Sequence, residues 1–121
     1  MRKMLLSTDL LMKSSRDKEG YVYIISNSNF PSYYKVGVTN DIKARLRTYQ
    51  TASPLRNYRI EYYVHHPDCY DAEKKIAEKL RYFATDIKNE WFRCDLEIVK
   101  GRLDESLEPE ENVLTFIKRG V

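Results

Sequence analysis

The clearest structural signal lies in residues 20–39, which read GYVYIISNSNFPSYYKVGVT. Two runs rich in β-branched and aromatic side chains, residues 21–25 and 33–38, flank a loop of Ser, Asn and Pro over residues 26–32. β-branched and aromatic residues favour strands, whereas Asn and Pro favour turns. Because the two runs are only a short loop apart, this stretch predicts an antiparallel β-hairpin.

Helix and strand signals alternate after the hairpin. Thr39 and Asn40 are residue types that cap helices, and they precede an amphipathic pattern that predicts a helix over residues 41–49. The aromatic and β-branched run at residues 58–64 predicts a third strand, followed by a loop over residues 65–70.

The next segment carries the strongest helical pattern of the chain, over residues 71–83. A short extended piece around Trp91 and a helix over residues 96–103 are expected after it. The order β-β-α-β-α predicts an α+β fold, with a small, mainly antiparallel three-stranded sheet flanked by helices.

A length of 121 residues fits one domain. We expect an N-terminal helical extension over residues 1–19, the folded domain over residues 20–100, and a mostly solvated acidic tail over residues 101–121. The tail holds five acidic residues against three basic ones.

Composition narrows the class of protein. The chain lacks a run of about 20 apolar residues, so no membrane-spanning helix and no membrane partner are expected. Two cysteines, Cys69 and Cys94, are too few for a disulfide framework or a four-ligand zinc site. We interpret them as reduced thiols of an intracellular protein of the cytoplasm or nucleus.

Charge is concentrated in one stretch of the chain. The whole sequence has a net charge of +3, but residues 35–59 alone carry +5, with Asp41 as their single acid. Tyrosines flank and interrupt these cations, which suits phosphate contact combined with base stacking better than a merely solvated helix face. The cations are Lys35, Lys43, Arg45, Arg47, Arg56 and Arg59.

Five short motifs occur along the chain in an order that points to a known family. They are Tyr21-Val22-Tyr23, Lys35-Val36-Gly37-Val38-Thr39, Arg45 eight residues after Gly37, Glu73 on the following helix, and Glu90-Trp91-Phe92. In this order they resemble the GIY-YIG endonuclease superfamily, in particular its compact branch of phage- and virus-associated proteins. The resemblance covers about residues 20–100 and is the basis for expecting a viral or phage-infected-cell setting.

The resemblance implies a metal-dependent endonuclease that hydrolyses phosphodiester bonds in DNA, with RNA left open. Its catalytic residues would be Tyr23 as general base or water-positioning phenol, Lys35 in place of a signature tyrosine, and Arg45 on the phosphate. Glu73 would hold Mg²⁺ or Mn²⁺, since Mg²⁺ often takes only one or two protein carboxylates. The expected substrate-binding residues are Tyr21, Gly37, Thr39, Lys43 and Arg47.

A phenol has a pKa of about 10, so a general base at Tyr23 needs a neighbour such as Lys35, Arg45 or the metal ion to favour the phenolate. Because a domain this small makes few base contacts, sequence specificity would either be low or come from a homodimer or an accessory protein.

Two departures from the family pattern keep other functions open. Lys35 replaces the second signature tyrosine, and Ala77 stands where the branch has a histidine four residues after the Glu. They motivate a catalytically impaired nucleic-acid-binding module of the same fold. A protein-interaction domain that uses exposed tyrosines and the acidic tail is the third hypothesis. His65 or His66 is a candidate substitute for the absent histidine.

Overall fold

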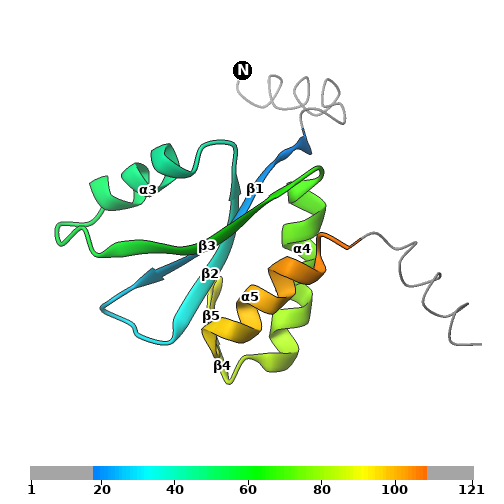
Figure 1. Cartoon of the computed structure of the whole chain (residues 1–121). Helices are drawn as coiled ribbons and strands as arrows, with labels where there is room; N and C mark the ends of the chain where they lie inside the picture. The colour runs from blue at the N-terminus through cyan, green and yellow to red at the C-terminus, as the bar shows by residue number, and fades with distance from the viewer. Residues whose placement is uncertain (1–17, 109–121) are drawn as a thin grey trace, which may run out of the picture.

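The computed structural model describes residues 18–108 (Figure 1). The elements follow one another as β1 (Gly20–Asn27), β2 (Tyr33–Thr39), α3 (Ile42–Thr51), β3 (Tyr58–His66), α4 (Cys69–Phe83), β4 (Asp86–Lys88), β5 (Trp91–Arg93) and α5 (Leu96–Glu105). The predicted N-terminal extension, apart from its last two residues, and the tail from residue 109 onward lie outside the described residues.

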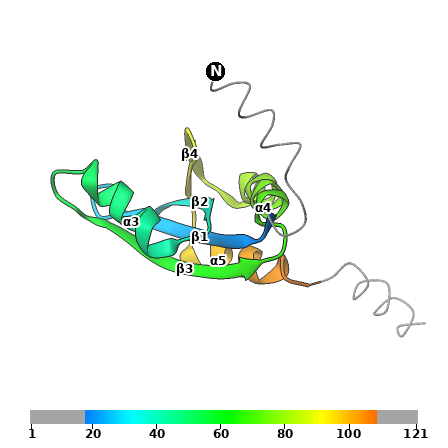
Figure 2. The same ribbon diagram turned by 90° about the horizontal axis from the view of Figure 1, so that it is seen from above.

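The strands form one sheet in the order β3-β1-β2-β5-β4, and every neighbouring pair is antiparallel. The α+β class and the β1–β2 hairpin are therefore confirmed. The sheet has five strands rather than the three expected, because β4 and β5 form a small hairpin that continues the sheet past β2. Figure 2 shows this hairpin on the far side of β2 from β3.

Alternation along β1 gives the sheet two different faces. Val22 and Ile24 are fully buried on one face, which we call the core face. Tyr21 and Tyr23 point to the other, which we call the tyrosine face. Alternate side chains of β1 therefore contribute to the packing on both faces of the sheet.

Helices α4 and α5 cover the core face and pack against each other (Figure 1). Their fully buried side chains each contribute about 1.5–3 kcal/mol by removing apolar surface from water. Helix α3 contacts β3 instead and buries none of its side chains completely. The core residues from α4 and α5 are Cys69, Ala72, Ile76, Leu80, Val99 and Leu103.

Gly37 makes room for a tyrosine ring on the tyrosine face. It lies opposite Tyr23 in the hairpin register. A Cβ atom at residue 37 would lie 2.4 Å from the Tyr23 hydroxyl oxygen and 2.5 Å from the ring carbon that carries it. The Tyr23 ring therefore lies across the glycine, and the glycine is required for space rather than for an unusual backbone angle.

The start of α3 differs from the sequence prediction. Asp41 is the N-cap, and its Oδ1 accepts a hydrogen bond from the backbone N–H of Ala44 at 3.0 Å. Neither Thr39 nor Asn40 caps the helix. The Thr39 hydroxyl is 3.1 Å from both the backbone nitrogen and the carbonyl oxygen of Asp41, so it fixes the turn that leads into the helix. The side chains of Thr39 and Asp41 both form hydrogen bonds with nearby backbone groups. Asp41 is the N-cap because its side chain is the one that reaches the first turn of the helix.

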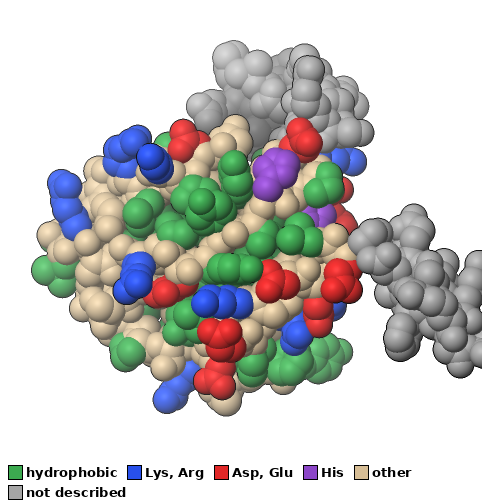
Figure 3. All heavy atoms as spheres, in the orientation of Figure 1, with side chains coloured by type: hydrophobic (Ala, Val, Ile, Leu, Met, Phe, Trp, Pro, Cys, Tyr) green, Lys and Arg blue, Asp and Glu red, His purple; other side chains and the backbone are tan. Residues whose placement is uncertain are grey.

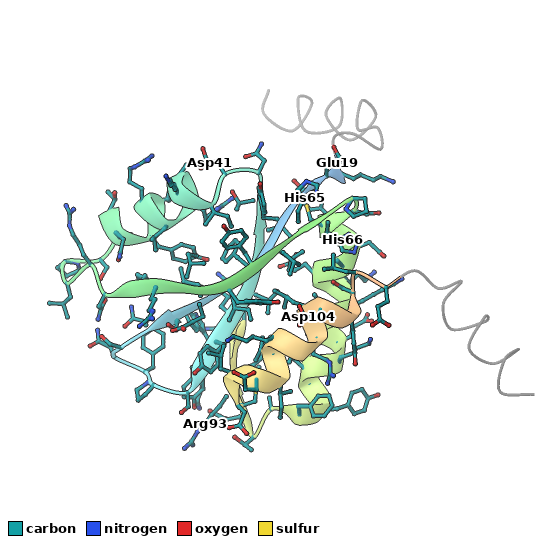
Figure 4. The ribbon with its side chains drawn as sticks, viewed as in Figure 1. Glu19, Asp41, His65, His66, Arg93 and Asp104 are labelled. Carbon is teal, nitrogen blue, oxygen red and sulfur yellow. The ribbon has the colours of Figure 1, made fainter. Side chains whose placement is uncertain are left out.

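Strand β3 is longer than predicted and includes both histidines, which lie at its end where the chain turns toward α4 (Figure 4). Helix α4 begins at Cys69, two residues earlier than predicted, with Asp68 as its N-cap. The His66 ring joins these parts, since its Nδ1 accepts from the Asp68 N–H at 2.9 Å and its Nε2 lies 2.8 Å from the Ser106 carbonyl oxygen. This ring bridges β3, α4 and the end of α5.

Helix α5 crosses residue 100, where the domain was expected to end. Leu103 is 0% exposed and belongs to the core. The folded part of the chain therefore includes the first residues of the segment 101–121 that was expected to be a solvated tail.

Cys69 and Cys94 are both free thiols. Within residues 18–108, no helix has the length and apolar character needed to cross a membrane.

Replacing Gly37 with Ala should destabilise the domain by about 1–3 kcal/mol, because the new methyl group overlaps the Tyr23 ring. Urea unfolding measures the change. Gly101→Ala is the matched control: a Cβ there meets nothing within 4 Å, and Ala in a helix interior should add about 0.5–1 kcal/mol of stability. In a Tyr23→Ala background the cost of Gly37→Ala should largely disappear, and an unchanged cost would refute this packing.

Replacing Leu103 with Ala should reduce the free energy of unfolding by about 2–5 kcal/mol, since it leaves a cavity between α5 and the sheet. Leu107→Ala, at a side chain that is 45% exposed, should stay within about 0.5 kcal/mol of the wild type. Equal effects of the two substitutions in a denaturant titration would contradict a core that extends past residue 100.

Candidate functional site

Tyr23 is the centre of a polar cluster on the tyrosine face. Its side chain is almost completely buried, with 2% of the residue exposed. Its hydroxyl oxygen lies 3.2 Å from that of Tyr49, which α3 places above the sheet. The two rings meet edge to face, with centroids 6.4 Å apart. Tyr49 therefore closes the space above the phenol of Tyr23.

The environment of Tyr23 favours the neutral phenol. Burial raises the pKa of Tyr23 far above its ordinary value of 10.0, and the hydrogen bond with Tyr49 raises it further. Arg45 acts in the opposite direction but is a weaker influence. Arg45 thus favours the phenolate, as expected of a neighbouring cation, but burial and the Tyr49 hydrogen bond outweigh it in the protein by itself.

Lys35 connects the cluster to the β4–β5 hairpin. Its Nζ lies 3.1 Å from Oε1 of Glu90 and 5.7 Å from the centre of the Tyr49 ring. Burial favours the neutral amine, but the bonds to Glu90 and Tyr49 outweigh it and raise the pKa of Lys35. Lys35 is consequently held as a cation over the Tyr49 ring rather than as a proton acceptor.

Glu90 reaches Lys35 because of a tight turn. Residues 89 and 90 join β4 to β5, and Asn89 has a φ of 57°. Asn tolerates this left-handed conformation better than most residues. The turn leaves the Glu90 side chain 76% exposed while its carboxylate holds Lys35.

Glu73 approaches the same cluster from α4. It is half-buried, next to Ala72, which packs into the core. Burial raises the pKa of Glu73, the Glu90 carboxylate raises it further, and Lys35 opposes both. Glu73 also raises the pKa of Tyr23. These mutual effects place Glu73 within electrostatic range of Tyr23, Lys35 and Glu90.

Arg45 lies on α3 one helical turn before Tyr49 and is exposed. Its charge lowers the pKa of Tyr23, against the larger effects described above. An exposed guanidinium beside a buried phenol is well placed to meet a ligand that approaches from solvent.

The structure thus brings together five of the predicted site residues, and it places the other four around them. Tyr21 and Thr39 are paired in the next row of the hairpin, on the same face as Tyr23. Lys43 and Arg47 are exposed on the outside of α3. The five residues that gather are Tyr23, Lys35, Gly37, Arg45 and Glu73.

Two members of the cluster were missed as site residues. Tyr49 was predicted as part of the apolar stripe of its helix and as one of the tyrosines among the cations, but not as a site residue, although its spacing of one turn after Arg45 puts both on one face. Glu90 was noted only as part of the Glu90-Trp91-Phe92 motif. A fold was needed to show that a residue of the second hairpin bonds to Lys35 of the first.

The two candidate substitutes for the absent histidine lie in different surroundings. Ala77 packs against the core, and His66 uses both ring nitrogens for backbone contacts. His65 is exposed, and its ring packs edge-on against Tyr21 with centroids 5.3 Å apart.

The donor set suits a hard divalent cation. No group of three His, Cys, Asp or Glu side chains within residues 18–108 forms a ready-made metal site. Mg²⁺ does not need one, because it keeps several waters and binds through one or two carboxylates. The carboxylate of Glu73 is half-buried, and both its burial and the nearby Glu90 disfavour its negative charge. A cation bound beside Glu73 would relieve this unfavourable interaction.

The surface around the cluster is asymmetric in charge. Figure 3 shows Lys and Arg side chains spaced along the α3 end of the molecule and Asp and Glu gathered over α5. An anionic polymer is therefore attracted to the end of the molecule that carries Arg45.

Comparison with known proteins identifies the family. Searches of curated proteins and of solved structures found no match. The model of the T5orf172 domain matches residues 20–106, from the first residue of β1 through the end of α5. This family is a phage-associated, endonuclease-type domain, which agrees with the nuclease-like character predicted from the motifs. Since the match covers well over half of the sequence, the chain belongs to the T5orf172 domain family.

Proposed function

We propose that this domain is a metal-dependent endonuclease that hydrolyses phosphodiester bonds in DNA with a GIY-YIG-type site. The observation that carries the proposal is that Tyr23 and Lys35 lie beside Gly37 on the tyrosine face, with Arg45 of α3 and Glu73 of α4 near enough to change the pKa of Tyr23. Each supplies a different requirement of phosphodiester hydrolysis. Their gathering from four elements, β1, β2, α3 and α4, is unexpected for residues that serve packing alone.

Arg45 binds the scissile phosphate in this proposal. Its planar guanidinium matches two phosphate oxygens, and such charge-assisted bonds are the stronger class of hydrogen bond. Lys43 and Arg47, exposed on the same helix, attract neighbouring phosphates without reading sequence. Helix α3 therefore acts as the electrostatic guide for the DNA backbone.

Glu73 holds the divalent cation, with Glu90 as a second carboxylate nearby. When bound, Mg²⁺ or Mn²⁺ neutralises charge on the phosphate and supports the departing 3′ oxygen. Lys35 remains protonated and keeps Glu90 oriented toward the site through their 3.1 Å ion pair.

Tyr23 and Tyr49 position the attacking water. Their hydroxyl groups share one hydrogen bond, so one oxygen of the pair keeps a lone pair that can accept a hydrogen bond from water. The water oxygen bonds to phosphorus as the bond from phosphorus to the 3′ oxygen breaks. Because Tyr23 is a neutral phenol in the resting protein, its role there is to orient the water. Tyr23 would take the proton of the water only after losing its own proton to solvent, a loss that a cation bound beside it would favour.

A nucleic-acid-binding module without cleavage is the second candidate function. The observations that favour it are Ala77, which contributes no polar group beside Glu73, and the neutralisation of Lys35 by Glu90. This alternative keeps the basic surface of α3 and predicts salt-dependent binding in which no phosphodiester bond breaks.

Purified protein with Mg²⁺ or Mn²⁺ should nick supercoiled plasmid. Glu73→Gln, Arg45→Ala and Tyr23→Phe should each reduce the rate by at least about a hundredfold, the usual effect of removing a group that acts in the transition state. Glu78→Gln, on the exposed side of the same helix, is the control and should cut normally. Salt-dependent DNA binding with no cutting in either metal would favour the binding module, and equal cutting by wild type and Glu73→Gln would exclude the proposed site.

Glu73→Gln should melt at a higher temperature than wild type in chelator near neutral pH. Burial raises the folded-state pKa of Glu73 above its unfolded value, so the folded protein binds this proton more tightly and ionised Glu73 destabilises the fold. That penalty is present above the folded-state pKa and is lost as the pH falls through it, so the advantage of the variant should shrink on acidification.

Mg²⁺ should then raise the melting temperature of wild type and of Glu78→Gln, but not that of Glu73→Gln, because only a site that binds the cation stabilises the folded state. These melting curves report cation binding without any cleavage. Lower stability of Glu73→Gln in chelator, or an equal response of all three proteins to Mg²⁺, would contradict the assignment of Glu73.

A further inference from the structure

A row of aromatic rings extends from the candidate site toward the second hairpin. It consists of Tyr49 on α3, Tyr58 on β3, Trp91 on β5 and Phe30 in the β1–β2 loop, and we call these four residues the aromatic row. Successive ring centroids lie 5.0 Å, 6.4 Å and 4.8 Å apart. The row starts at the ring that contacts Tyr23 and Lys35.

The aromatic row is separate from the main hydrophobic core. Tyr58 pairs with Asn27, which puts it on the tyrosine face, opposite the face that α4 and α5 cover. The core that those helices build contains none of the four rings. All four are half-buried, so each ring keeps part of its surface in contact with water.

Cations lie at the end of this partly exposed apolar strip that is nearest the candidate site. Lys35 lies over the Tyr49 ring, and the exposed Arg45 lies on α3 one turn before Tyr49. Arg56 is exposed in the loop between α3 and β3. Flat rings next to solvent-facing cations are complementary to a ligand that offers both π-faces and negative charge, which is the combination found in nucleic acids.

The geometry points to the aromatic row as a stacking surface for unpaired nucleobases, so that the substrate is DNA with single-stranded or splayed-out bases beside the cleaved phosphate. This inference rests on the proposed function, since it takes the scissile phosphate to lie near Arg45. In an uninterrupted duplex the faces of the bases are already stacked on one another. A protein ring can reach those faces only where bases are unpaired or turned out of the helix.

The chain contains its own reporter for this contact. Trp91 is its single tryptophan and lies inside the aromatic row. A base that stacks on the row should quench Trp91 fluorescence directly. Full-length Glu73→Gln protein in chelator keeps the DNA intact during the titration and retains every ring of the row.

Titration with an oligothymidylate should quench Trp91 and give tighter binding than a blunt duplex of the same number of phosphates. Phe30→Leu and Tyr58→Leu keep an apolar side chain but remove a flat ring, and each should weaken single-strand binding by about 5- to 150-fold. Duplex binding, which depends on phosphate contacts, should change little. Tyr82→Leu, at a ring that is 90% exposed on α4, is the control and should leave both affinities unchanged.

Equal quenching by duplex and single strand, or single-strand affinities that ignore both Leu variants while their melting curves remain two-state, would overturn the inference. Should either Leu variant fail to fold, the preference of the Glu73→Gln parent for oligothymidylate over duplex decides the matter. Plasmid nicking by wild type separates the two proposals. Glu73-dependent nicking together with no single-strand preference would refute the stacking surface alone, whereas single-strand preference without nicking would refute the cleavage activity alone.

Discussion

The contact between the Tyr23 ring and Gly37 underlies both the fold and the candidate site. The ring can lie across the hairpin only because residue 37 has no side chain and lies opposite it in the register. A shift of the hairpin by one residue would turn Tyr23 toward the core and Val22 or Ile24 toward α3. The same packing that fixes this register therefore delivers the phenol to Tyr49, 26 positions away in the sequence.

Much of this architecture could be predicted from local sequence, and the failures have physical causes. Strands β1, β2 and β3 and helix α4 are long enough for their periodicity to show. Strands β4 and β5 have three residues each, too few for any pattern, so only pairing with β2 defines them. The cap of α3 was misassigned because Thr39, Asn40 and Asp41 are all capping types, and the choice depends on which side chain reaches Ala44.

The sequence predicted most residues of the candidate site but not the residues that contact them. Motif spacing predicted Tyr23, Arg45 and Glu73 as a set, but each was expected to act on the substrate directly. The structure adds Tyr49 and Glu90, whose importance comes from contacts between distant segments. These contacts also change the electrostatic expectation, since burial and a tyrosine neighbour outweigh the nearby arginine and keep Tyr23 protonated.

The two-faced sheet accounts for part of the tyrosine excess. Tyr21, Tyr23, Tyr58 and Tyr63 lie on the tyrosine face, whereas Tyr34 and Tyr62 pack against the core and Tyr70 and Tyr82 lie on α4. The buried residues that α4 and α5 cover are mostly aliphatic. On the tyrosine face α3 packs against β3 and buries none of its own side chains completely, so side chains there pack a ring against neighbours and still present a polar atom to water or ligand. Tyrosine meets both demands, with an apolar body and a hydroxyl tip. A face that is partly open to solvent is also the surface on which a nucleic acid can find rings to stack on, beside cations that hold its phosphates. The tyrosines of this face and the proposed substrate therefore have one structural origin.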